Sequence, residues 1–91
     1  MKKIFKYPIP VADEFFLQLT LFAEILTVQM QKSEPMLWVL LNPDEPNWER
    51  KFNLYGTGMT ISADAHNYIG SFQMLNGALI YHLFEVVDLP F

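Results

Sequence analysis

Hydrophobic and polar residues alternate along most of this chain, a pattern typical of strands whose two faces meet different surroundings. The alternation predicts strands at residues 3–9, 14–20, 24–31, 36–41, 49–57, 68–74 and 78–86. It is cleanest in the third range, where three apolar residues are separated by polar ones: Leu26, Val28 and Met30 against Thr27, Gln29 and Gln31. One helix capped by Asp13 is the alternative for residues 13–26, because apolar residues there also recur at helical spacing.

Turn-forming residues separate these ranges. Asn76-Gly77 is the strongest hairpin signal, because both central positions of a tight turn need positive φ. Residues 32–35 and 42–47 are predicted to be short connections. Residues 36–41 are apolar throughout, which is typical of a strand covered on both faces, here by its own core and by a subunit partner. Residues 59–67 are predicted to be irregular or a short helical turn, and residues 88–91 a tail.

Strands at this spacing predict an all-β, mainly antiparallel fold, either a small β-sandwich or a partly open barrel. The 91 residues leave room for a single β domain spanning residues 1–91. A chain of this length buries only about 60–65% of its unfolded surface. It has no cysteine for disulfides, and 52% of its residues are hydrophobic. We therefore expect a homo-oligomer that covers some aromatic surface, with an unusually apolar monomer as the alternative.

The net charge of −4 argues against long nucleic acid as a partner, because such binding relies on many Lys and Arg residues. A small anion needs only one or two cations and some backbone N–H groups, so it remains compatible with this charge. The basic start lacks a following apolar stretch, which predicts no signal peptide. No segment approaches the roughly 18 apolar residues of a membrane span. We expect a soluble, cytoplasmic protein with no membrane partner.

Residue patterns typical of catalysis are missing from the sequence. There is no cysteine and no Gly-x-Ser-x-Gly motif, and Asp44, Glu45 and Glu49 are best interpreted as a solvated acidic loop. The two histidines, His66 and His82, lack metal-ligand spacing. We therefore expect no enzyme, no metal site and no cofactor, and a function in binding. A small hydrolase with an unrecognised site is the least favoured alternative.

The segment Gly56-Thr57-Gly58 is the most informative candidate for a binding site. Two glycines around a hydroxyl residue let a backbone approach a ligand and present N–H groups to an anion, although a plain turn or bulge is the alternative. Arg50 lies on the same predicted strand, and an arginine can hold a phosphate through two parallel hydrogen bonds. Arg50→Ala is then expected to abolish anion binding and to leave the fold intact.

Aromatic residues supply candidate stacking platforms for a base. Trp38, Tyr55 and Tyr68 are the residues we assign to stacking, and Gln73 and His82 to reading base or ribose edges. Aromatic residues at strand spacing are more often core, which is the alternative for Trp38 in particular. The apolar neighbours of His82 indicate a hydrogen-bonded histidine of a core or pocket.

Several stretches together resemble a family of small, phage-encoded β domains. The matching residues are Lys6-Tyr7-Pro8, residues 23–31, Leu37-Trp38, Asn42-Pro43-Asp44, Gly56-Thr57-Gly58, residues 68–73, Gly77-Ala78-Leu79 and residues 82–85. The chain departs from the pattern at Met59, where relatives often carry His, and at Thr20, where they often carry Pro. The first departure puts a role for that histidine in doubt in this chain.

The chain looks like the phage sponge proteins that oppose cyclic-oligonucleotide defence (anti-CBASS). This resemblance implies an immune-evasion protein of the host cytoplasm, which assembles from small subunits and sequesters a cyclic dinucleotide, or a related nucleotide messenger, without cleaving it. Arg50 and residues 56–58 would then hold phosphate. The alternative function is a phage interaction module that inhibits or associates with a host or virion protein through residues 36–41.

Overall fold

The computed structural model describes residues 1–62 and 66–86, and all its regular elements are strands. The seven strands are β1 (Lys3–Pro8), β2 (Glu14–Thr20), β3 (Glu24–Gln31), β4 (Glu34–Leu41), β5 (Asn47–Gly56), β6 (His66–Met74) and β7 (Leu79–Val86). Every pairing between them is antiparallel. The all-β prediction is therefore confirmed. Among the described residues, none belongs to a helix with the length and apolar character that crossing a bilayer requires.

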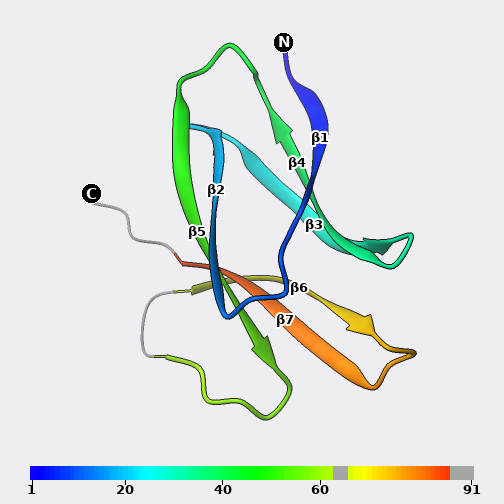
Figure 1. Ribbon diagram of the computed structural model, residues 1–91. Coiled ribbons are helices and arrows are strands. Elements are labelled where there is room, and N and C mark those ends of the chain that lie inside the picture. The colour runs from blue at the N-terminus through cyan, green and yellow to red at the C-terminus, as the bar shows by residue number, and fades with distance from the viewer. Residues whose placement is uncertain (63–65, 87–91) are drawn as a thin grey trace.

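The strands form two sheets, with strand orders β1–β4–β3 and β2–β5–β7–β6 (Figure 1). The chain passes between the sheets after β1, after β2 and after β4, whereas β3–β4 and β6–β7 are hairpins within one sheet. β5 is the longest strand, at ten residues, and lies between β2 and β7. Because β5 is paired on both edges, residues of β2, β5 and β7 lie side by side on each face of this sheet.

The hydrophobic core lies between the sheets, because both contribute their inward-facing residues. Alternate residues of β4 (Leu37, Val39 and Leu41) meet Phe52 and Leu54 of β5 and neighbours from β2, β3, β6 and β7. Leu37, Val39, Phe52 and Leu83 are fully buried. Six of the strands thus present one face to the core, as the sequence alternation indicated, whereas β1 contributes only the partly buried Tyr7.

β3 and β6 are edge strands of different sheets that contact one another. A Cβ added to Gly70 of β6 would lie 3.3 Å from Cγ1 of Val28 on β3, so the glycine allows a close approach. Both strands carry a shift in register, between Ile25 and Thr27 in β3 and between Tyr68 and Gly70 in β6. These irregularities bend the two edges where they cross.

The structure decides between the alternatives for residues 13–26, because β2 and β3 replace the single helix. The β6–β7 hairpin forms at the predicted place but has a longer connection, since Met74 pairs with Leu79. Asn76 and Gly77 adopt positive φ as predicted, at 55° and 87°. Leu75 also has positive φ, at 52°, which was not predicted. β6 also begins earlier than predicted, at His66. Residues 63–65 of the predicted irregular stretch, and the tail at 88–91, lie outside the described residues.

Residues 36–41 belong to β4, the central strand of its sheet, and only one face of this strand is covered by the core. Its odd-numbered residues are buried, whereas Met36, Trp38 and Leu40 are half-buried on the outward side. The core thus supplies the one cover that was predicted within the protomer, and a second cover from another subunit stays a prediction. A continuous run of apolar residues does not show whether one face of a strand is buried or both faces are.

Candidate functional site

Seven side chains gather on the outward side of the β2–β5–β7–β6 sheet. They come from β5 and the residue after it, from β6 and from β7: Asn53, Tyr55, Thr57, His66, Tyr68, His82 and Phe84. On β5 and β7 they alternate with the core residues Phe52, Leu54 and Leu83, so the pleat points them away from the core. We call this surface the tyrosine–histidine face.

Phe84 stands at the centre of this face and orders the rings around it. Its ring centroid lies 5.6 Å from Tyr55, 5.5 Å from His66 and 5.1 Å from Tyr68, each in an edge-to-face arrangement. Such contacts fix the orientation of the rings beyond what burial alone would do. The rings of the tyrosine–histidine face are therefore held in defined orientations within the protomer.

Hydrogen bonds link the polar ends of these side chains. In His82, Nε2 lies 2.9 Å from Oγ1 of Thr57, and Nδ1 lies 3.4 Å from Oη of Tyr68. A neutral imidazole donates from one nitrogen and accepts at the other, and hydroxyl groups can meet either demand. His82 is therefore hydrogen-bonded, as its interpretation required, but it lies half-buried on the outward side rather than in the core.

A second group of polar contacts surrounds His66. Its Nε2 lies 3.3 Å from Oη of Tyr55, and Nδ2 of Asn53 donates to the same tyrosine oxygen at 3.2 Å. Asn53 is only 9% exposed, and its Oδ1 is a buried acceptor without a hydrogen-bond partner. An unpaired buried acceptor is costly. This oxygen has almost no accessible surface, so it is not in reach of a ligand in this structure.

The charge of the tyrosine–histidine face differs from that of the whole chain. The chain has ten acidic residues, but none of the seven side chains of this face is acidic. Lys51 lies on the same side of β5, two residues before Asn53, and pairs with Glu14 at 3.1 Å. Tyr68 is 57% exposed, which leaves part of its ring open to a partner. Lys51 and Glu14 thus place one cation and one anion beside an aromatic surface that suits stacking of a heterocyclic ligand.

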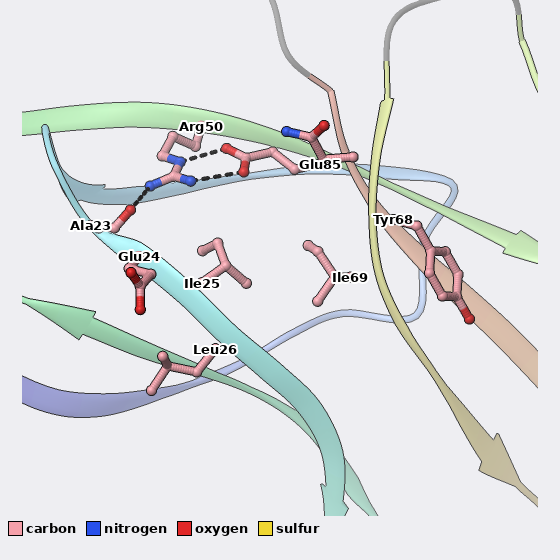
Figure 2. A pocket seen from close by; sticks show the side chains of 9 residues that line it. Ala23, Glu24, Ile25, Leu26, Arg50, Tyr68, Ile69 and Glu85 are labelled. Atoms are coloured by element: carbon pink, nitrogen blue, oxygen red, sulfur yellow. Dashed lines mark hydrogen bonds and ion pairs between the residues drawn. The ribbon is translucent and has the colours of Figure 1, made fainter.

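A separate cleft of about 470 Å³ lies on the core side of the same sheet, between β3 and β6. Its lining comes from both bulged edges and from the charged residues behind them: Ala23, Glu24, Ile25, Leu26, Arg50, Asn67, Tyr68, Ile69 and Glu85. Figure 2 shows Ile25 and Ile69 facing each other across the cleft, with Arg50 and Glu85 at one end and Tyr68 turned away.

Arg50 is already bound to the protein at that end of the cleft. Its Nε and Nη2 donate to the two carboxylate oxygens of Glu85 at 2.5 and 2.7 Å, and its Nη1 donates to the carbonyl of Ala23 at 2.5 Å (Figure 2). The side chains of Arg50 and Glu85 are only 16% and 14% exposed. The guanidinium therefore connects β5 and β7 to the start of β3, and a phosphate would have to compete with a carboxylate for it.

The predicted partnership between Arg50 and residues 56–58 meets a geometric obstacle. Both belong to the β5 region, but they are six residues apart on an extended strand, which separates them by about 20 Å. One phosphate cannot reach across that distance. Phosphate binding by either group alone stays a prediction.

The chain matches a family model over nearly its whole length: the domain of unknown function DUF7352 covers residues 1–89. The chain belongs to the DUF7352 family. No curated protein and no solved structure matches it. The family description assigns no ligand, so a function for this DUF7352 chain has to be argued from its own residues.

The remaining predicted residues of this DUF7352 chain are dispersed. Residues 56–59 form a turn in which the Met59 N–H donates to the Gly56 carbonyl and Gly58 adopts φ of 91°, which explains that glycine without a ligand. Trp38 lies on the other sheet, with the Lys6 ammonium 5.8 Å from its ring centroid. Gln73 pairs with Ile80, two positions beyond the Ser71–His82 pair, so the register puts it on the side of the tyrosine–histidine face.

The structure therefore unites Tyr55, Thr57, Tyr68 and His82, and places Arg50 and Trp38 elsewhere. Sequence reasoning did not identify Asn53, His66 and Phe84 as site residues. Asn53 and Phe84 could have been found by counting two positions from Tyr55 and His82 along their strands. His66 could not, because it was assigned to an irregular segment and its pairing depends on the β6 bulge.

Proposed function

We propose that this DUF7352 chain binds a small nucleotide, in particular a cyclic dinucleotide or related messenger, and sequesters it without cleavage. The resemblance to anti-CBASS sponge proteins motivates the ligand class and the role in phage immune evasion within the host cytoplasm. The tyrosine–histidine face is the observation that carries the proposal. It offers an aromatic platform and polar groups on one surface.

Stacking on Tyr68 is the central contact of this proposal. Its ring is 57% exposed and is held by Phe84 and His82, so a base can lie against it with little loss of side-chain freedom. Stacking of one base on an aromatic side chain contributes about 1–3 kcal/mol. Thr57 and His82 then supply hydrogen-bonding groups beside the platform.

Negative charge on the ligand requires a local cation, because the chain as a whole carries −4. Lys51 replaces Arg50 as the first candidate, since it lies on the same side of β5 as Tyr55 and its ion pair with Glu14 is partly exposed. The tyrosine–histidine face carries no carboxylate, so a paired-carboxylate hydrolysis finds no support there. Sequestration without cleavage follows as the favoured outcome.

Thermal unfolding with a nucleotide panel tests this proposal. The panel contains cyclic dinucleotides, linear dinucleotides and mononucleotides, and the expected result is a rise in melting temperature of several degrees with at least one cyclic compound. The protein is then denatured by heat and the released nucleotide is analysed by chromatography. Recovery of unaltered ligand supports sequestration, whereas conversion would identify an enzyme.

Substitutions at the platform locate the site. Tyr68→Ala is expected to weaken binding about 10- to 100-fold, in proportion to the loss of one stacking contact, and Tyr68→Phe to retain most of the affinity. Gln29→Ala, at an exposed position of the other sheet, is the control and is expected to bind as the wild type does. Equal affinity of Tyr68→Ala and the control would exclude this face as the site.

A further inference from the structure

The two sheets have four edge strands, and three of them are protected against pairing with another chain. Edge strands are commonly protected by lysines, prolines or bulges. β1 carries Lys3, Lys6 and Pro8. β3 and β6 each carry a register shift and lie against one another.

β2 (Glu14–Thr20) is the remaining edge and has none of these features. It pairs with β5 over seven consecutive residues without a register shift, and it contains no lysine and no proline. Phe16 projects from its outward side and is 51% exposed. A regular strand of this kind offers an unbroken row of backbone donors and acceptors to a second strand.

We propose that β2 is the interface through which two copies of this chain associate, by antiparallel pairing of one β2 strand with the other. The pairing joins the two β2–β5–β7–β6 sheets into one continuous sheet. It is a contact of a surface with itself, as a two-fold dimer requires. The observations on β2 that favour this interface hold whether or not a nucleotide binds.

The sequence of β2 complements itself in this arrangement. With the two-fold axis at Leu17, Phe16 faces Gln18 of the second copy and Phe15 faces Leu19 of the second copy. Paired residues have the same parity, so inward-facing residues remain inward across the junction. Glu14 faces Thr20 of the second copy, and the two Glu14 residues lie at opposite ends of the pairing. No like charges therefore oppose each other on β2.

The second copy, rather than a different protein, is the occupant that these features favour. Antiparallel pairing of two copies places inward-facing residues opposite inward-facing residues along the whole of β2 and opposes no like charges. The pairing also supplies what a small apolar chain lacks, since 52% of its residues are hydrophobic and it has no disulfide.

Complementary charges on β2 test the interface. Phe16→Lys with Gln18→Lys places lysines opposite lysines, and Phe16→Glu with Gln18→Glu places glutamates opposite glutamates. Light scattering at about 100 μM is expected to show the wild type at twice the 10.6 kDa chain mass or more, and each double variant at a lower mass. Mixing the two variants is expected to restore the wild-type mass, because lysines then face glutamates.

A control variant adds two lysines, as the lysine variant of β2 does, but places them on the other sheet. Ile4→Lys with Gln29→Lys changes two exposed positions of the other sheet and is expected to leave the mass unchanged. A wild type at the mass of one chain, or a double variant that keeps the wild-type mass, would overturn the proposal.

Hydrogen exchange of the wild type gives a readout that does not depend on how the variants fold. Amide protons of β2 are expected to exchange more slowly as protein concentration rises, whereas those of the β1 edge are expected to be unaffected. Exchange at β2 that is independent of concentration counts against the interface. Because no nucleotide is present in these measurements, their outcome does not bear on the proposed function.

Discussion

Arg50 and Lys51 are consecutive cations on β5, and the pleat of the strand sends them to opposite sides of the sheet. Arg50 faces the other sheet and binds Glu85 and the Ala23 carbonyl with its side chain 16% exposed. Lys51 points outward, 33% exposed, and pairs with Glu14. The same charge thus stabilises the contact between sheets in one case and forms a partly exposed surface ion pair in the other.

This contrast extends to the two sides of the β2–β5–β7–β6 sheet. The inward side carries the buried core and the Arg50–Glu85 pair, which position the strands. The outward side carries the tyrosine–histidine face, whose side chains are bonded mainly to one another. Substitutions on the inward side should therefore change stability, and those on the outward side should change binding.

Arg50→Ala is the substitution with the largest expected effect on stability. It leaves the Glu85 carboxylate largely buried without its partner and removes the contact to Ala23, so we expect a loss of about 3 kcal/mol in the free energy of unfolding. Urea denaturation followed by circular dichroism measures this loss. The sequence alone predicted that this variant would keep its fold intact. The contacts of Arg50 lead us to expect a destabilised fold instead.

Arg50→Ala with Glu85→Ala separates the charge from the packing. Removing both partners takes away the uncompensated carboxylate, so the double variant is expected to be more stable than Arg50→Ala alone. If the double variant folds and still binds nucleotide, Arg50 takes no part in the binding site. A double variant no more stable than the single one would mean that the pair is not coupled.

The fold was largely predictable from the sequence, because alternation carries strand positions directly. The ranges predicted for β2 and β3 match the structure at both ends. The lengths of turns were less predictable. At the β6–β7 hairpin the sequence predicts positive φ at Asn76 and Gly77, but nothing in it predicts that Leu75 joins them at φ of 52°. Pairing across the hairpin, rather than local preference, determines that connection.

The site was less predictable than the fold, for a reason visible at Arg50. Alternation shows that Arg50 and Lys51 lie on opposite sides of a strand, but it does not say which side meets the other sheet. Glu85 and Ala23 are 35 and 27 residues away from Arg50 in the chain, and no local pattern connects them. Tyr55 and Tyr68 were identified only because aromatic side chains suit stacking on bases, whereas their ordering by Phe84 required the register of three strands.

Gly70→Val tests the inward side at the crossing of β3 and β6, with a smaller expected effect. A Cβ there already meets Cγ1 of Val28 at 3.3 Å, so the larger side chain has to push the two strands apart. We expect a loss of roughly 1–3 kcal/mol, measured by urea denaturation. Ser71→Val is the matched control, because Ser71 is exposed on the opposite side of the same strand. Similar losses at both positions would contradict the division between the two sides.

Lys51→Ala is expected to have the smallest effect on stability and thereby sharpens the contrast with its neighbour. Its ion pair with Glu14 is exposed by 33% and 51%, and such surface pairs contribute about 0.2–1 kcal/mol. If Lys51 provides the cation for a bound phosphate, the affinity for a cyclic dinucleotide should fall and should depend less on salt concentration. Lys32→Ala, at an exposed turn of the other sheet, is the control that changes the net charge equally. Titration at two salt concentrations measures both effects, and an affinity equal to that of the control would exclude Lys51 from the site.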